Sequence, residues 1–318
     1  KKPMKIAILD ESFLEEGHLE RLRTLGEVDV YHATVNEEEA VERLNGVNIA
    51  IADYYVTPLT ANLFSQTKGL SLVCLNSIGF EGVDIVAARE RGISVANAPG
   101  FCVQSVAEHT FALMLALSRK VVLGDRAMRS RPFQVDPANQ SECELSLGMD
   151  LAGKTLGVIG LGEIGMRVAM IAKAFGMNVI GYNRTKSDTG IPDVELEDLL
   201  VQSDVVSIHL ALNKETEGII SRERLKLMKS TALLINTARG KHIDEPAMVE
   251  ALLTHRLAGA GLDVIADWGE SNPLLPLPNV VLSPHSAFLS KESLKLLADR
   301  IVDTVESFVR GEPINIVN

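Results

Sequence analysis

The sequence predicts an α/β fold with two doubly wound parallel-sheet domains, and three observations lead to this fold class. Short apolar runs alternate with helical patterns along most of the chain, which is typical of parallel strands covered by helices on both faces. The chain has 318 residues, which is more than one hydrophobic core usually serves. The run Gly160-Leu-Gly-Glu-Ile-Gly165 lies in mid-chain, where a strand pattern passes into a helix pattern.

The first part of the chain shows this alternation throughout. Its second expected helix begins with Glu37-Glu-Glu39, where carboxylates suit the positive end of the helix dipole. We expect strands at residues 6–9, 28–31, 49–52, 70–75 and 93–96, and helices at 14–25, 37–44 and 83–91.

The second part repeats the scheme after the turn Ala98-Pro-Gly100. A helix is expected from 103 to about 129, and its apolar residues lie on several faces, so we expect it to be buried between domains or between subunits. Residues 132–147 are less regular and predict a loop. We expect further strands at 155–159, 178–182, 205–210, 232–235, 258–264 and 280–282, and helices at 163–175 and 291–309.

Charge and cysteine content narrow the classes of partner. The net charge is −11 and no basic stripe occurs, which disfavours nucleic acid and anionic membranes. The cysteines Cys74, Cys102 and Cys143 form no CxxC pair. This suits a reducing compartment, and we expect a cytoplasmic protein without a bound metal. The apolar stretch 111–117 is too short for a membrane span, which needs about 20 residues.

The three glycines of the central turn have separate tasks in a dinucleotide site. Gly160 permits the tight turn, Gly162 lets a pyrophosphate approach the backbone, and Gly165 lets the helix pack against the strand. The N-terminus of that helix adds free N–H groups and a positive dipole end. A dinucleotide cofactor is therefore expected, with a chance glycine turn as the alternative.

The end of the next strand bears on which dinucleotide binds. An NAD site usually places Asp or Glu about 20 residues beyond the glycines, whereas this chain has Asn183-Arg-Thr-Lys186 there. Amide, guanidinium and hydroxyl groups suit a 2′-phosphate, which a carboxylate would repel. We therefore expect NADP(H) rather than NAD(H). Two alternatives stay open: Arg184 and Lys186 are only exposed turn residues, or Asp188 supports NAD.

Residues with acid–base and anion-binding chemistry follow the later strands. Arg239 ends a buried strand, where ligands bind in open α/β sheets, and its guanidinium can hold a carboxylate bidentately. His285 follows the last strand in Ser283-Pro-His285, at a strand end in the same crevice as Arg239, and is therefore a candidate catalytic residue. His209 also ends a strand and is expected on the cofactor side. A surface Arg and a structural His are the competing interpretations.

With these segments in view, the chain resembles the D-isomer-specific 2-hydroxyacid dehydrogenase family over essentially its whole length. The segment Tyr182-Asn-Arg-Thr185 is similar to the Ser-Arg-Ser type turn of the NADPH-dependent glyoxylate/hydroxypyruvate reductases in that family. The matching segments are Asn76-Ser-Ile-Gly79 through Val83-Asp84, Asn97-Ala-Pro-Gly100, Ser105-Val-Ala-Glu108, the glycine turn, Asn236-Thr-Ala-Arg-Gly240, Gly261-Leu-Asp-Val264, Pro273-Leu-Leu275 and Pro284-His285.

The resemblance implies a Rossmann cofactor domain, residues 100–286, inserted into a flavodoxin-like substrate domain formed by 1–99 and 287–318. Closure at hinges near Pro99 and Pro284 would expel water from the substrate. It also implies a homodimer that forms through the helix at 103–129.

The resemblance also implies roles for individual residues. Arg239 would bind the substrate carboxylate and polarise the carbonyl, backbone N–H groups near Ser77, Ile78 and Gly79 would hold the other carboxylate oxygen, and NADPH would deliver hydride while His285 donates the proton. Asp263 would lie near the nicotinamide. The implied cofactor-binding set is Gly160, Gly162, Glu163, Ile164, Gly165, Asn183, Arg184, Thr185, His209, Leu210, Ala211, Thr237, Ala238, Asp263, His285 and Ala287.

One position departs from the family pattern. The family usually has Glu five residues after the Asp of this strand, paired with the catalytic His, and counting from Asp263 places Trp268 there. Glu270 is our candidate replacement, because a carboxylate partner would favour a protonated His285. Two alternatives stay open: Asp267 takes this place, or neither residue does. Formate dehydrogenases of the family carry Gln at this position. We expect Trp268 to line the substrate pocket.

Two classes of function follow. The first is an NADPH-dependent reductase of glyoxylate, hydroxypyruvate or pyruvate, with bulkier keto acids left open because Tyr54, Tyr55, Trp268 and Phe288 are candidates for an apolar pocket. The second is a dinucleotide-sensing, corepressor-like protein with weak turnover. A phosphorylated substrate would need a basic cluster near Ser77, which the sequence lacks.

Overall fold

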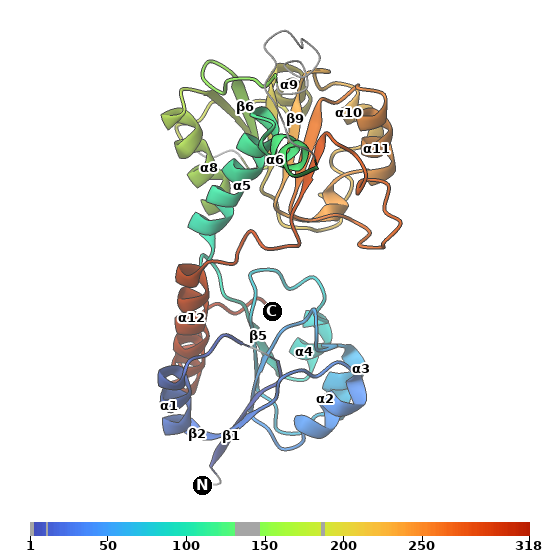
Figure 1. Ribbon diagram of the computed structural model, residues 1–318. Helices are drawn as coiled ribbons and strands as arrows, with labels where there is room; N and C mark the ends of the chain where they lie inside the picture. Colours follow the sequence, from blue (N-terminus) through green and yellow to red (C-terminus); the bar gives the residue numbers. More distant parts are fainter. Residues whose placement is uncertain (1–2, 11, 131–146, 186–187) are drawn as a thin grey trace. The chain divides into compact units, whose positions relative to one another are not determined.

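The computed structural model describes residues 3–10, 12–130, 147–185 and 188–318. The chain divides into two compact units, each built on one parallel sheet (Figure 1). The first unit is Lys1–Cys102 with Leu289–Asn318, and the second unit is Val103–Phe288. The sequence-predicted residues Cys143 and Lys186, and almost all of the loop at 132–147, lie outside the described residues.

The first unit has five parallel strands in the order β2-β1-β3-β4-β5. Each strand after the first pair is added beside the previous one, which is the flavodoxin-like arrangement. The central strands are fully buried, so their apolar residues follow one another without alternation. The strands are β1 (Met4–Ile8), β2 (Gly26–Val30), β3 (Ile49–Ala52), β4 (Leu72–Leu75) and β5 (Ser94–Ala96).

Helices cover both faces of this sheet. One face packs against α2 (Glu37–Arg43), α3 (Ala61–Gln66) and α4 (Ile85–Glu90) in a shared hydrophobic cluster. The other face holds α1 (Glu16–Leu25) and the last helix, α12 (Lys291–Val309), which lie side by side (Figure 1). The chain's last helix therefore belongs to the same unit as its first residues.

The second unit has six parallel strands in the order β11-β10-β9-β8-β6-β7. A parallel bridge between Gly181 and Asp193 adds one more pairing outside β7, and with it the order is that of a Rossmann sheet. The strands are β6 (Thr155–Ile159), β7 (Asn178–Tyr182), β8 (Val205–Ile208), β9 (Leu233–Asn236), β10 (Gly259–Leu262) and β11 (Val280–Leu282).

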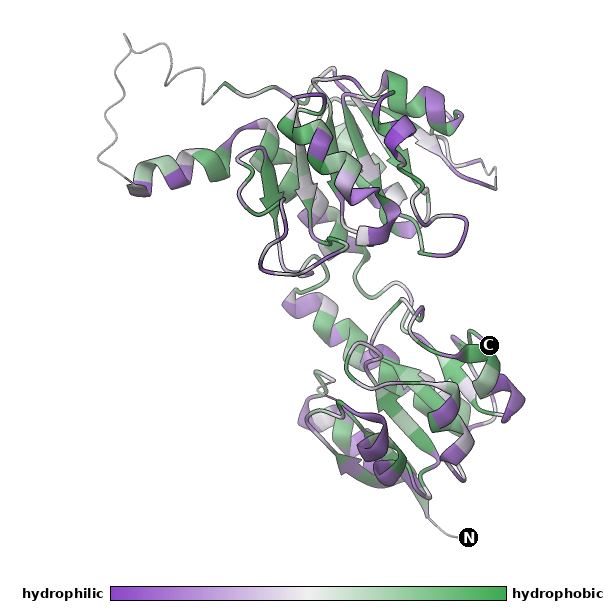
Figure 2. Cartoon of the chain, turned by 90° about the vertical axis from the view of Figure 1, so that its right-hand side faces the viewer, coloured by the Kyte–Doolittle hydropathy of each residue, from purple (hydrophilic) through white to green (hydrophobic). Residues whose placement is uncertain are grey.

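This sheet is also covered on both faces. On one side lie α5 (Val103–Ser118) and α8 (Glu163–Ala174), and on the other lie α9 (Leu196–Gln202), α10 (Arg222–Leu225) and α11 (Glu245–Leu253). The hydrophobic residues gather in the strands and on the inner sides of these helices (Figure 2). Within each sheet, all strands are parallel and their carboxyl ends therefore lie at the same edge, which is where ligands bind in such folds.

The prediction of one helix from 103 to about 129 was wrong. The chain forms two helices, α5 and α6 (Val121–Ser130), because Lys120 adopts a left-handed conformation with φ of 56° between them. The inner face of α5 is buried against the sheet and α8 of the second unit, whereas α6 exposes Val121 and Met128 by 59% and 56%. Burial between domains or between subunits stays a prediction. Apolar composition alone did not locate this break, since no Gly or Pro marks it.

Candidate active site

The glycine turn after β6 has a different spatial constraint at each glycine. Gly160 has a backbone φ of 95°, which residues other than glycine rarely adopt. A Cβ at Gly165 would overlap the carbonyl oxygen of Gly160, whereas a Cβ at Gly162 would meet nothing within 4 Å. The backbone N–H of Leu161 donates to Asn183 Oδ1 at 2.8 Å. The turn is therefore fixed at its two ends and open in the middle.

The helix that starts at this turn has no side-chain cap. Gly162 is its N-cap residue and offers no side-chain oxygen to the first N–H groups of α8. Such N–H groups and the helix dipole together bind anions. The exposed Glu163 and half-buried Ile164 occupy the first helical turn, so the residues present fit a pyrophosphate.

A cleft of about 430 Å³ opens beside the turn, between the ends of β6, β7 and β8. Arg184 pairs with Glu215 at its rim, and both side chains are well exposed. Asp188 does not line it. Six of the expected cofactor residues line the cleft: Gly162, Asn183, Arg184, Thr185, Leu210 and Ala211. Sequence reasoning missed Leu161, Tyr182, Asn213, Glu215, Thr216 and Ile219, several of which follow the end of β8.

Two histidines lie next to the cleft walls. His209 binds Ser207 Oγ through Nε2 at 2.8 Å, and burial lowers its pKa to about 3, so the ring is neutral. The buried His242, which the sequence did not single out, reaches the carbonyl oxygens of Leu210 and Thr216, both at 3.0 Å. The ring therefore lies between the two ends of the 210–216 loop, part of which lines the cleft.

Arg239 follows β9 and begins a short 3-10 helix, η1 (Gly240–His242). The side chain of buried Asn236 folds this turn, because its Nδ2 donates to the Arg239 carbonyl at 2.8 Å and its Oδ1 accepts from the N–H of Ala238 at 3.0 Å. The guanidinium is half-buried and donates to the Ala238 carbonyl at 2.8 Å. The neighbouring Thr237 is buried. Arg239 is thus a cation at the carboxyl end of a central strand.

His285 follows β11, one strand beyond β10 in the same sheet. Its backbone is left-handed, with φ of 52°, and its N–H donates to the Asp263 carbonyl at 2.9 Å. The fully buried Asp263 carboxylate accepts from Ser283 Oγ at 2.5 Å and from the N–H groups of Ser286 and Ala287, both at 2.9 Å. The structure therefore shows Asp263 holding the turn that carries His285.

A residue of α11 holds the segment that contains Trp268, the position that differs from the family pattern. Glu245 accepts hydrogen bonds from the Ala266 N–H at 2.6 Å and from Asn272 Nδ2 at 2.8 Å. Trp268 is 55% exposed and Glu270 is exposed too. Asp267 Oδ1 accepts from the Gly269 N–H at 2.9 Å. Pairing of a carboxylate from this segment with His285 stays a prediction.

In the first unit, the expected substrate-binding loop follows β4. Ser77 Oγ donates to the Gly79 carbonyl at 2.7 Å, and Asn97 Nδ2 donates to the Ile78 carbonyl at 2.7 Å. Within the described part of the chain, no hydrogen bond engages the backbone N–H groups of Ser77, Ile78 and Gly79. Their carbonyl groups build the loop, and their N–H groups can receive an anion.

Comparison with known proteins decides the family. Residues 111–287 match the family described as "D-isomer specific 2-hydroxyacid dehydrogenase, NAD binding domain". A glycerate dehydrogenase from Methylorubrum extorquens is 37% identical over 98% of both chains. A glyoxylate reductase from Korarchaeum cryptofilum is 36% identical over 99% of this chain and 96% of its own. The chain belongs to the D-isomer-specific 2-hydroxyacid dehydrogenase family.

Solved structures agree with this assignment. An acyclic imino acid reductase (Bsp5) in complex with NADPH and D-Arg superposes with a TM-score of 0.91 at 34% identity, over 99% of this chain and 100% of that one. A glyoxylate reductase from Paecilomyes thermophila gives 0.90 at 30% identity, over 100% and 99%. The protein is thus an NAD(P)-dependent oxidoreductase of the 2-hydroxyacid dehydrogenase family, as the sequence predicted, and the sensor interpretation is not favoured. No helix in the described part of the chain is long and apolar enough to cross a membrane.

Proposed function

We propose that this dehydrogenase reduces a small 2-keto acid, of the glyoxylate or hydroxypyruvate kind, to the D-2-hydroxy acid with NADPH. The supporting observation is that Arg239 and His285 follow β9 and β11, which flank β10 in the sheet that also carries the glycine turn. A carboxylate anchor and a proton donor thus share one sheet edge with a dinucleotide-binding turn.

The residues divide the reaction between them. Arg239 binds the substrate carboxylate through its planar fork and draws electron density from the neighbouring carbonyl. NADPH, when bound, supplies the hydride. His285 donates its ring proton to the carbonyl oxygen, which becomes the hydroxyl of the product, and the imidazole then recovers a proton from solvent. Fixing the His285 backbone through Asp263 keeps this donor in one place.

The preference for NADPH rests on the end of β7. Asn183 uses its oxygen to hold the glycine turn and lines the cleft, so its NH₂ group is the part of the side chain that could donate to a ribose. Arg184 and Thr185 line the same cleft and supply a cation and a hydroxyl. Glu215 pairs with Arg184 and would give up that pairing to a 2′-phosphate, so Arg184 is the residue to test.

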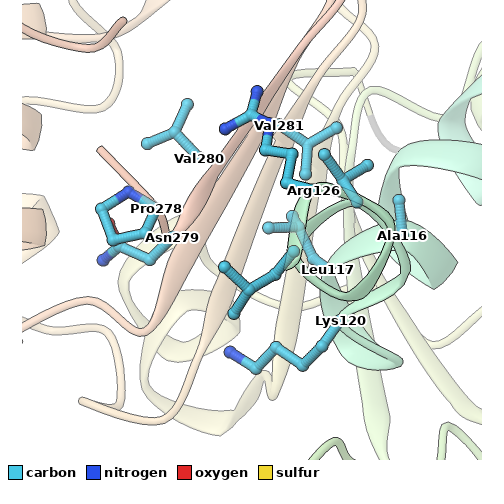
Figure 3. Close-up of a pocket in the computed structure, with 10 residues that line it drawn as sticks. Ala116, Leu117, Lys120, Arg126, Pro278, Asn279, Val280 and Val281 are labelled. Atoms are coloured by element: carbon cyan, nitrogen blue, oxygen red, sulfur yellow. The ribbon is translucent and has the colours of Figure 1, made fainter. Parts of the chain in front are cut away.

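We also propose domain roles and an assembly. The first unit would be the substrate domain and the second the cofactor domain, with Ser77, Ile78 and Gly79 holding one substrate oxygen. A homodimer would form over α6, whose exposed Val121 and Met128 support such a contact. The hollow between α6 and residues 278–281 is about 20 Å³ (Figure 3), room for one water rather than a substrate.

The deciding experiment measures NADPH and NADH oxidation with a panel of 2-keto acids, from glyoxylate to phenylpyruvate. We expect turnover with the smallest acids and a lower KM for NADPH. Tight NADPH binding without turnover on any acid would favour a sensor, and tighter binding of NADH would refute the cofactor assignment.

A pair of variants tests the phosphate site. Arg184→Ala should weaken NADPH binding about tenfold, the loss of one charge-assisted contact, and leave NADH binding within twofold. Arg222→Ala is the matched control, because Arg222 is also in a surface ion pair, with Glu250, but does not line the cleft. Equal losses for both cofactors would assign Arg184 to general binding.

A further inference from the structure

Helix α5 contacts both catalytic turns through two adjacent residues. His109 Nε2 lies 2.7 Å from Ser283 Oγ and 3.5 Å from Asp263 Oδ1. Thr110 Oγ1 lies 3.1 Å from Thr237 Oγ1. One residue therefore reaches the turn that carries His285, and the next reaches the segment that carries Arg239.

Small residues in β10 allow this close approach. A Cβ on Gly261 would come within 3.0 Å of Leu113 Cβ, and one on Gly259 within 3.3 Å of Leu117 Cδ2. Both leucines are buried on the face of α5 that packs on the sheet. Since α5 rests directly on β10, the side chain of His109 can reach the strand end at Asp263.

The hydrogen bonds around Asp263 form a chain with one direction. Ser283 Oγ donates its only proton to Asp263 Oδ1, so its oxygen is left to accept from the Nε2–H of His109. The same carboxylate accepts the N–H groups of Ser286 and Ala287. The chain runs from helix α5 to the two residues that follow His285.

The His285 backbone needs such support. Its φ of 52° is one that non-glycine residues rarely adopt, and conformations of this kind persist only where the surroundings fix them. The Asp263 side chain fixes the residues after His285, and the Asp263 carbonyl fixes its N–H. His109 fixes the orientation of Ser283 and therefore of that carboxylate.

We propose that His109 is a positioning residue for the reaction, acting through Ser283 and Asp263 to hold His285 in its left-handed conformation. This proposal rests on the proposed function only in taking His285 as the proton donor. Thr110 has the corresponding contact to the Arg239 segment, so helix α5 orients the acid and the anchor from one rigid element.

The test compares His109→Leu, His109→Gln and Thr110→Val in the full-length protein. The Leu variant lacks the donor, so kcat should fall about tenfold while KM for the 2-keto acid changes less than twofold. Gln can donate through its amide and should recover most of kcat. Hydrogen exchange, measured with NADPH bound, should show the Ser286 and Ala287 amides exchanging about tenfold faster in the Leu variant and near the parent rate in the Gln variant.

The Thr110→Val variant is the control on the same helix. It removes the hydroxyl that meets Thr237 and should leave the exchange of Ser286 and Ala287 at the parent rate. Parent-like exchange and kcat in His109→Leu would overturn the proposal. A loss of kcat would also overturn it if His109→Gln does not restore kcat and if kcat falls in proportion to the melting temperature of each variant. If the parent reduces no 2-keto acid, the proposed function fails, while the exchange rates still decide whether His109 holds the turn.

Discussion

Alanine at Gly162 and at Gly165 should separate cofactor binding from folding within one six-residue turn. A Cβ on Gly165 would lie 1.9 Å from the Gly160 carbonyl oxygen, where ordinary contact begins at 3.4 Å. The difference, 3.4 − 1.9, means that helix and turn must separate by about 1.5 Å. A Cβ on Gly162 meets nothing within 4 Å, and its φ of −72° and ψ of −169° suit any residue.

The expected magnitudes differ accordingly. Overpacking of this kind costs about 1–3 kcal/mol, and for a unit of this size each kcal/mol lowers Tm by about 2–4 °C. Gly165→Ala should therefore melt about 2–12 °C below the parent. At Gly162, the weaker N-cap costs about 0.5–1 kcal/mol, and the stiffer unfolded chain offsets about 0.4–1 kcal/mol. Its Tm should stay within about 3 °C of the parent.

Cofactor affinity should instead fall in the Gly162→Ala variant, whose stability changes little. If the proposed pyrophosphate site at the N-terminus of α8 is right, the methyl group of Gly162→Ala would take up space that the pyrophosphate needs. NADPH should then bind at least about tenfold more weakly, or about 1.4 kcal/mol. Thermal melts and fluorescence titration with NADPH measure the two quantities. Affinity within twofold of the parent in Gly162→Ala, or a parent-like Tm in Gly165→Ala, would refute this account of the turn.

Three further substitutions test the chemistry and the pH response. His285→Asn should lower kcat by about 10²–10⁴-fold; a kcat within tenfold of the parent would remove it as the proton donor. Arg239→Lys keeps the charge but loses the fork, so KM for the keto acid should rise at least about tenfold, and an unchanged KM would place the carboxylate elsewhere. The third is His209→Asn. Burial lowers the His209 pKa from 6.5 to about 3, so between these pH values only the unfolded chain takes up the proton. Relative to the variant, the parent should therefore lose up to about 1.4 kcal/mol of stability per pH unit as the pH falls below about 6.5; equal slopes in urea unfolding at pH 7, 6 and 5 would contradict this.

The sequence was most informative where hydrophobic period and local chemistry agree. The strands at 49–52, 155–159, 178–182 and 280–282 have the predicted ends, because apolar runs bounded by polar or glycine residues allow few alternatives. The break at Lys120 was missed, since a lysine in the left-handed region has no sequence signature comparable to glycine.

In the candidate site, too, the sequence reveals the chemically unusual residues but not the residues that contact them from distant elements. Arg239 and His285 stand out because an unusual chemical group follows a strand, which is a local observation. The groups that hold the neighbouring segments do not stand out: Glu245 of α11 holds the segment at 266–272, and His109 reaches Ser283, next but one to His285, across 174 residues of sequence. Such hydrogen bonds depend on how closely elements pack, and here that closeness follows from Gly259 and Gly261 in β10. The glycines are readable in the sequence, but their consequence appears only once α5 is known to lie on that strand. In this site, therefore, small residues in a buried strand decide which distant side chain can reach the turn that carries His285.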